Sequence, residues 1–132
     1  THGAVLHEII PSSGSHRREV LRFQHAQDED RPVHILGTGT IGYHSDTVVA
    51  FDWSRIADLP ISNDEAFAVM AKQHGVSLVS IARDEKWMVS HEDMNFGVYE
   101  EKTLTPGYHQ SILAFLKQNE PWSEPMLPES VV

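Results

Sequence analysis

The 132-residue sequence contains no cysteine. This absence excludes disulfide bonds and thiolate metal sites, and it is compatible with the cytoplasmic location that we expect. No run of 18 or more apolar residues is present, so the sequence predicts no membrane span. The first residues show no signal-peptide pattern, and they do not begin with methionine, so we expect a processed product or a fragment of a longer chain.

Basic residues are also scarce. The sequence contains ten lysines and arginines against nineteen acidic residues, which gives a net charge of −9. A broad nucleic-acid surface is therefore not expected. Arg17, Arg18 and Arg22 form a small basic cluster, which solvated charges on a strand explain. The sequence has no GxGxxG, Walker or HExxH motif, and its nine histidines are scattered. A histidine-based metal hydrolase is accordingly the weakest of the functions considered.

The composition, with 40% hydrophobic and 22% charged residues, is typical of a globular domain. We predict one α/β domain over residues 1–120, with a small mixed sheet and two main helices, followed by an extended proline-rich tail at 121–132 that packs Trp122. The expected helices cover 63–74 and the region after Thr105-Pro106. The expected strands are 3–10, 17–26, 33–36, 41–44, 76–82 as an inner strand, and a short one at 96–99. For 17–26, a helix is the alternative.

The helix at 63–74 has the clearest local signals. Ser62 and Glu65 have the spacing of a capping box, and Gly75 stands where a left-handed C-terminal residue is wanted. Five residues at helical spacing predict one buried stripe: Ala66, Phe67, Met70, Ala71 and His74.

A turn of glycine and threonine, Gly37-Thr38-Gly39-Thr40, lies between two predicted strands. Glycine allows a ligand to approach the backbone, and successive N–H groups with threonine hydroxyls can hold a phosphate. No helix is predicted to follow directly, so the turn is not a dinucleotide or Walker loop. By spacing alone, a plain bend between strands is the stronger interpretation.

Two acidic residues, Asp64 and Glu65, stand in the first turn of the predicted helix. Helix capping and a favourable charge at the positive end of the helix dipole explain them without any catalytic role. The alternative makes Asp64 a general base, because a helix start at the end of a strand layer often borders a ligand cleft.

Histidine and tryptophan residues in the links provide weaker candidates. His44, just before Ser45-Asp46, fits an ordinary hydrogen-bonding histidine better than a ligand. Residues 91–93, His-Glu-Asp, could bind a divalent cation or form a solvated loop. Trp53, Trp87 and Trp122 could stack on sugar rings, with core packing as the equal alternative.

The order of these pieces resembles the acceptor-side half of GT-A glycosyltransferases of the family 2 type. The matching segments are LGTGTIGYHSDTV (36–48) and ISNDEAFAVMAKQHGVSLVSIAR (61–83). The chain resembles more closely still a bacterial subgroup of these enzymes, linked to capsule and cell-surface polysaccharide. The elements shared with that subgroup are His2-Gly3, Val33–His44, Asp64, Ile81-Ala82-Arg83, and Gln110 through Pro121-Trp122.

The resemblance implies a role for each matching position. Asp64 falls at the catalytic base, which deprotonates the acceptor hydroxyl. The substrate-binding residues implied are Gly37, Thr38, Gly39 and Thr40 along the cleft, and His44 near the diphosphate or metal. Apart from the resemblance, we also expect Glu65 and Trp87 to bind substrate. The chain departs from the family because the nucleotide-binding front half with its Asp-x-Asp motif is absent; Asp28-Glu29-Asp30 follows a polar segment.

From these features we expect the acceptor-side part of a glycosyltransferase that is inactive alone. Its substrates would be a nucleotide-sugar and a carbohydrate acceptor, and its partner a separate N-terminal half chain. Mg²⁺ or Mn²⁺ would bind with that half, and no metal ligand is assigned in this chain. The alternative is a non-catalytic acidic α/β protein that binds a partner through tryptophans and its acidic C-terminal part.

Overall fold

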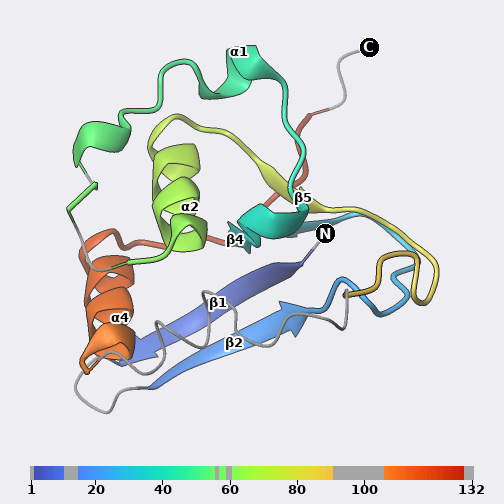
Figure 1. Cartoon of the computed structure of the whole chain (residues 1–132), viewed down its shortest axis with the longest axis horizontal. Coiled ribbons are helices and arrows are strands. Elements are labelled where there is room, and N and C mark those ends of the chain that lie inside the picture. Colours follow the sequence, from blue (N-terminus) through green and yellow to red (C-terminus); the bar gives the residue numbers. More distant parts are fainter. Residues whose placement is uncertain (1, 11–14, 56, 59–60, 91–105, 130–132) are drawn as a thin grey trace.

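The computed structural model describes residues 2–10, 15–55, 57–58, 61–90 and 106–129. In these residues the chain forms two small antiparallel sheets and three α-helices (Figure 1). The predicted α/β class is confirmed. The single mixed sheet is wrong for the described residues, because all their strand pairs are antiparallel and they belong to two sheets. The predicted strand at 96–99 lies outside the described residues.

The larger sheet has the strand order β2-β1-β4, with β1 (Gly3–Ile10), β2 (Ser15–Leu21) and β4 (Ile35–Leu36). β1 is confirmed as predicted, and its register with β2 shifts between Leu6 and Glu8. Ala4 and Leu6 are buried on the same face, as the two-residue period of a strand requires. β2 is shorter than predicted, because the chain turns away after Leu21.

The second sheet pairs β3 (Arg31–Val33) with β5 (Leu78–Ser80). The predicted strand 33–36 is thus divided at His34, since Val33 pairs with Leu78 while Ile35 pairs with Ala4. β5 covers only part of 76–82 and pairs with β3 alone among the described strands. Its prediction as an inner strand is therefore wrong for the described residues, because only one of its two edges is paired.

The strand predicted at 41–44 is also wrong. This part of the chain has no strand pairing in the structure; it lies between η2 (Thr38–Thr40) and α1 (Ser45–Val48), and η3 (Trp53–Arg55) follows. Gly42 and the exposed Tyr43 supply little surface to bury against a sheet, so an apolar pattern of four residues was a weak signal.

The main helix, α2 (Asn63–Gln73), begins at the predicted residue and ends one residue earlier than predicted. Every residue from Ala66 to Ala71 is buried, whereas His74 is exposed, so the helix runs through the core and the predicted single stripe is too narrow. The Ser62 hydroxyl donates to the Glu65 carboxylate and makes no capping bond to the backbone, so the predicted capping by Ser62 is wrong. Gly75 has φ of 67°, which confirms the left-handed end.

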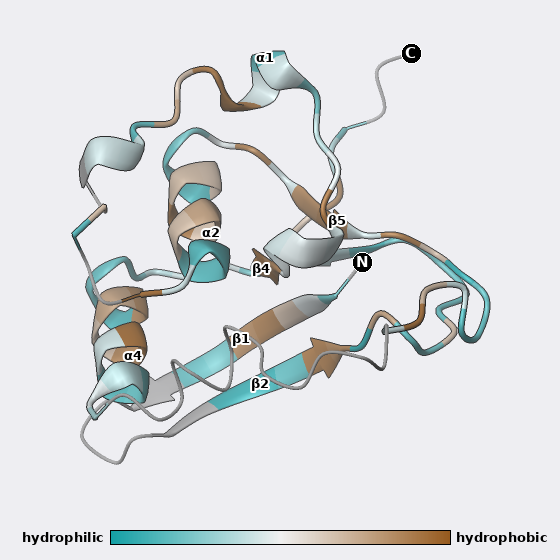
Figure 2. Ribbon diagram, viewed as in Figure 1, coloured by the Kyte–Doolittle hydropathy of each residue, from teal (hydrophilic) through white to brown (hydrophobic). Residues whose placement is uncertain are grey.

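The core lies between the helices and the sheets. α2 packs on β4, and α4 (Tyr108–Gln118) packs on β1. Figure 2 shows the apolar residues of α2 and of the first half of β1, whereas the middle of β2 is polar. The large side chains of this core include Phe51, Phe67, Met70, Leu113 and Leu116. Burial of these side chains is the main stabilising force, at roughly 25 cal/mol per Å² of apolar surface.

Trp122, in the described part of the predicted tail, packs back on this core. The Trp122 indole N–H donates to the Leu116 carbonyl at 2.8 Å, and its ring lies against the core cluster. His34 holds the next residue, because its Nε2 lies 2.7 Å from the Ser123 carbonyl oxygen. The prediction that the tail packs Trp122 is confirmed.

His34 must be neutral to make both of its hydrogen bonds. The Leu6 N–H donates to Nδ1 at 2.8 Å, so Nδ1 carries no proton and Nε2 donates to Ser123. Burial lowers the pKa of His34 below its ordinary 6.5, against the opposing effect of the Ser123 carbonyl. The unfolded chain therefore binds a proton at a higher pH than the folded chain, and stability falls as the pH drops below about 6.5.

We predict that the free energy of unfolding is larger at about pH 7.5 than at about pH 5.5, and that this difference shrinks in His34→Gln. Glutamine can accept and donate like the neutral imidazole but does not titrate. Urea unfolding of both proteins at each pH measures the effect. Other titrating groups, including His2, are common to both proteins, so an equal pH dependence would show that His34 is not responsible.

Candidate functional site

The candidate site forms where α2 begins beside the glycine–threonine turn. Thr38 donates twice to Asp64 Oδ1, from its backbone N–H at 2.8 Å and from its hydroxyl at 2.7 Å. The carboxylate thus caps η2 from a helix 26 residues further along the chain. Within the described residues, Oδ2 receives no hydrogen bond, so one oxygen of this partly buried carboxylate remains available as an acceptor.

The same turn is tied to the first residues of β1. The Gly37 N–H donates to the His2 carbonyl at 2.8 Å, and the His2 N–H donates to Thr40 Oγ1 at 3.0 Å. A Cβ atom at Gly37 would lie 3.2 Å from the His2 Cβ, so glycine permits this close approach. Three segments distant in sequence therefore meet at one point: the start of β1, η2 and the start of α2.

The backbone N–H groups of the turn are largely occupied. Those of Gly37, Thr38 and Thr40 donate to His2, Asp64 and Gly37 respectively. Phosphate binding through successive N–H groups stays a prediction, and in this conformation it would have to displace these bonds. The glycine at position 37 is explained by packing against His2, and no atom lies within 4 Å of a Cβ built at Gly39.

Glu65 follows Asp64 in the chain, but its carboxyl group is largely buried and bonds to Ser62 instead of Thr38. Burial raises the pKa of its carboxyl, and the negative charge of Asp64 acts in the same direction, while the hydrogen bond from Ser62 opposes them. The two neighbouring acids therefore differ in role. Asp64 holds the turn, and Glu65 holds the residue that precedes the helix.

His2 is the residue of this site to which the sequence gave no role. Its ring lies near Phe23, with 6.2 Å between ring centroids. Burial is the main cause that lowers the pKa of His2; the positive charge of Arg22 also lowers it, and the charge of Asp64 raises it. In the sequence, only the His2-Gly3 pair of the family resemblance pointed to this position. No local pattern could do so, because strand pairing is what brings His2 to the turn.

Two predicted binding residues lie apart from this arrangement. His44 accepts from the Asp46 N–H at 3.2 Å and caps α1, and its side chain is exposed. Trp87 is 58% exposed, and its backbone N–H donates to the Asp84 carbonyl in a local turn. The structure brings Thr38 to Asp64 but gives neither of these residues a described contact with it. Their substrate-binding roles stay predictions.

The described donors do not fit a divalent ion. No group of three or more histidine, aspartate or glutamate side chains in these ranges is placed to hold a metal, and the segment 91–93 lies outside them. At Asp64, Oδ1 is already bonded to Thr38 and the neighbouring Glu65 is bonded to Ser62. The expected Mg²⁺ or Mn²⁺ site of the donor-side half is not tested by these residues.

Comparisons with protein-family models and with curated proteins give no assignment. The chain matches no protein-family model, and it has no significant match among curated proteins. Among the helices that the structure describes, none is long and apolar enough to cross a membrane.

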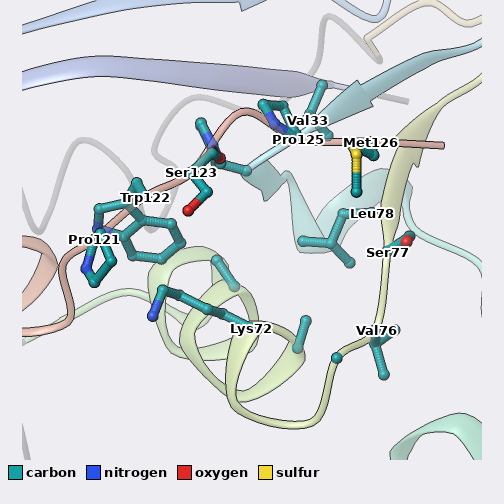
Figure 3. Close-up of a pocket in the computed structure, with 14 residues that line it drawn as sticks. Val33, Lys72, Val76, Ser77, Leu78, Pro121, Trp122, Ser123, Pro125 and Met126 are labelled. Atoms are coloured by element: carbon teal, nitrogen blue, oxygen red, sulfur yellow. Dashed lines mark hydrogen bonds between the residues drawn. The ribbon is translucent and has the colours of Figure 1, made fainter. Parts of the chain in front are cut away.

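A cavity of about 350 Å³ lies away from Asp64, between α2, β5 and the C-terminal segment (Figure 3). Its wall is mainly apolar, with Lys72 as its one side chain of fixed charge. The apolar residues that shape it include Val33, Ala68, Ala71, Val76, Leu78 and Trp122. The sequence suggests Trp122 as a platform for a sugar ring, but it does not place this residue opposite α2.

Proposed function

We propose that this chain forms the acceptor side of a GT-A-like glycosyltransferase, with Asp64 as the general base. The ordered resemblance over most of the chain supplies the reaction class. The observation that carries the proposal is the contact between Asp64 and Thr38, because it joins the two matching segments at one point. The carboxylate faces the turn as this role requires, and its second oxygen can serve an acceptor hydroxyl.

In the proposed reaction, Asp64 Oδ2 takes the proton of the acceptor hydroxyl. At the same time, the hydroxyl oxygen bonds to the anomeric carbon of the donor sugar. The bond between this carbon and the nucleoside diphosphate breaks, and the electron pair leaves with the diphosphate. A general base must lie within about 2.6–3.2 Å of the hydroxyl in the substrate complex. The two hydrogen bonds from Thr38 limit rotation of the carboxylate, which keeps Oδ2 in a fixed position.

Donor binding is assigned to another half, because no Asp-x-Asp pair ends an apolar strand in this sequence. This half would carry the nucleotide-sugar and the metal ion. The chain by itself is therefore not expected to turn over substrate.

We predict that sugar transfer appears only when this chain is joined to or mixed with an upstream half whose apolar strand ends in Asp-x-Asp. The measurement is nucleoside diphosphate release from UDP- and GDP-sugars with Mn²⁺ and a carbohydrate acceptor, for each half and for both together. Activity of the upstream half alone, unchanged on addition of this chain, would contradict the assignment. Reading the upstream coding sequence for such a strand is a cheaper first test.

A non-catalytic acidic α/β binding protein is the second candidate. The cavity favours it, because the space for a ligand lies beside Trp122 and away from Asp64. Trp53 and Trp87 are exposed and offer further contact surface. In this case, substitutions in the cavity would abolish binding of the partner, whereas Asp64→Asn would leave it unchanged.

A further inference from the structure

We propose that the cavity between α2, β5 and residues 121–126 binds a small aromatic carboxylate. The shape of the cavity, the nature of its wall and the position of Lys72 support this proposal. It does not depend on the sugar-transfer proposal, since the cavity contains neither Asp64 nor the glycine–threonine turn.

The shape of the cavity suits a flat ring. Ala68 and Ala71 of α2 line one side, and their small side chains leave room above the helix. The indole of Trp122 stands opposite Leu78 across the open space, as Figure 3 shows. An aromatic ring between them would bury apolar surface on both faces, at roughly 25 cal/mol per Å², with ring–ring attraction toward Trp122 in addition.

Two polar side chains on the inner wall are already satisfied, which leaves the hydroxyls of Ser77 and Ser123 and the ammonium of Lys72 as its polar side-chain groups. The His34 Nε2–H donates to Ser123, and the Trp122 indole N–H donates to Leu116. The wall therefore offers few groups for the several hydroxyls of a sugar, and it favours an apolar ligand body. The cavity of about 350 Å³ falls at the small end of the range for ligand pockets, roughly 300–1,000 Å³.

Lys72 supplies the preference for an anion. Its Nζ lies 5.7 Å from the centroid of the Trp122 ring, at the border of the cavity. Within the described residues it forms no ion pair, although the chain carries a net charge of −9. A carboxylate on the ligand would give this ammonium a charged partner while the ring occupies the slot. One cation at the edge of an apolar slot selects a monoanion with a single ring system.

The test uses indole-3-acetate as the probe and its uncharged amide, indole-3-acetamide, as the matched ligand. Titration followed by backbone amide NMR is expected to shift signals of residues 68–78 and 121–126 with both. We expect the carboxylate to bind about fivefold more tightly, since a partly exposed ion pair contributes up to about 1 kcal/mol.

Two variants locate the interaction. Lys72→Met keeps the apolar stem and should remove the fivefold preference for the carboxylate. The control is Lys117→Met, which removes an exposed lysine on α4 that pairs with Glu120. This variant should retain the preference. Val76→Phe should fill the cavity and abolish binding of both ligands. Thermal unfolding of each variant checks that it is folded.

Several results would overturn the proposal. These are shifts outside the two segments, an equal loss in both lysine variants, or no binding of the carboxylate by the wild-type chain at millimolar concentration. The binding titration contains no nucleotide-sugar. A negative result of the titration therefore leaves the proposed sugar transfer unaffected, and a negative result for sugar transfer leaves the titration interpretable.

Discussion

Replacing Asp64 by asparagine is expected to lower the rate of sugar transfer by the completed enzyme about 100- to 10,000-fold, the usual contribution of a general base. The amide oxygen of asparagine can still accept both hydrogen bonds from Thr38, so the junction between α2 and η2 is preserved. An amide does not take up the hydroxyl proton, so the loss falls on the chemical step. The measurement is kcat at saturating nucleotide-sugar and acceptor.

Matched variants separate catalysis from stability in this experiment. Asp58→Asn makes the same chemical change at an exposed position and should leave kcat unchanged. Asp64→Ala should lower kcat to a similar extent as Asp64→Asn and also lower the free energy of unfolding by about 1 kcal/mol, because the Thr38 donors lose their acceptor. An unchanged kcat in Asp64→Asn would remove Asp64 from the mechanism.

Replacing Arg83 by methionine is expected to lower the free energy of unfolding by about 3 kcal/mol or more, a large part of the 5–15 kcal/mol typical of a domain. Arg83 is only 9% exposed. Its guanidinium donates to three backbone carbonyls, those of Arg22 at 2.6 Å, Ile81 at 2.9 Å and Phe23 at 3.1 Å. Methionine keeps much of the apolar stem but leaves these acceptors without the donor.

The Arg83 network fastens the loop after β2 to the end of β5. The backbone of Arg83 also exchanges two hydrogen bonds with Gln27, at 2.8 and 2.9 Å. Urea unfolding of Arg83→Met should therefore be compared with Arg31→Met, which removes an exposed ion pair to Glu19 worth about 0–1 kcal/mol. Equal destabilisation by the two substitutions would show that the buried network contributes no more than a surface pair.

Short-range patterns predicted the elements whose signals lie within a few residues. The apolar run at 3–10 became β1, and the helix 63–74 was located from its apolar spacing and from Gly75, whose positive φ only glycine adopts easily. The same patterns failed around the turn. The apolar residues 33–36 were predicted as one strand, but His34 divides them because each half finds a different partner.

Asp64 illustrates the limit for the candidate site. Its residue type and its place at a helix start were visible in the sequence, and both helix capping and base catalysis explained them. The structure adds that the carboxylate caps a second helix, η2, across 26 residues. The contribution of His2 to the same junction was hidden for the same reason, since strand pairing with β4 determines where the first residues of β1 lie.

The sequence by itself determined the α/β class, the acidic surface charge, the main helix and its ends, and the candidate base at position 64. Each of these depends on composition or on residues close together in the chain. Only the tertiary structure decided which strands pair, that Thr38 meets Asp64, and that Ser123 meets His34 across 89 residues. Such contacts depend on how buried surfaces fit together, and local periodicity carries no information about that fit.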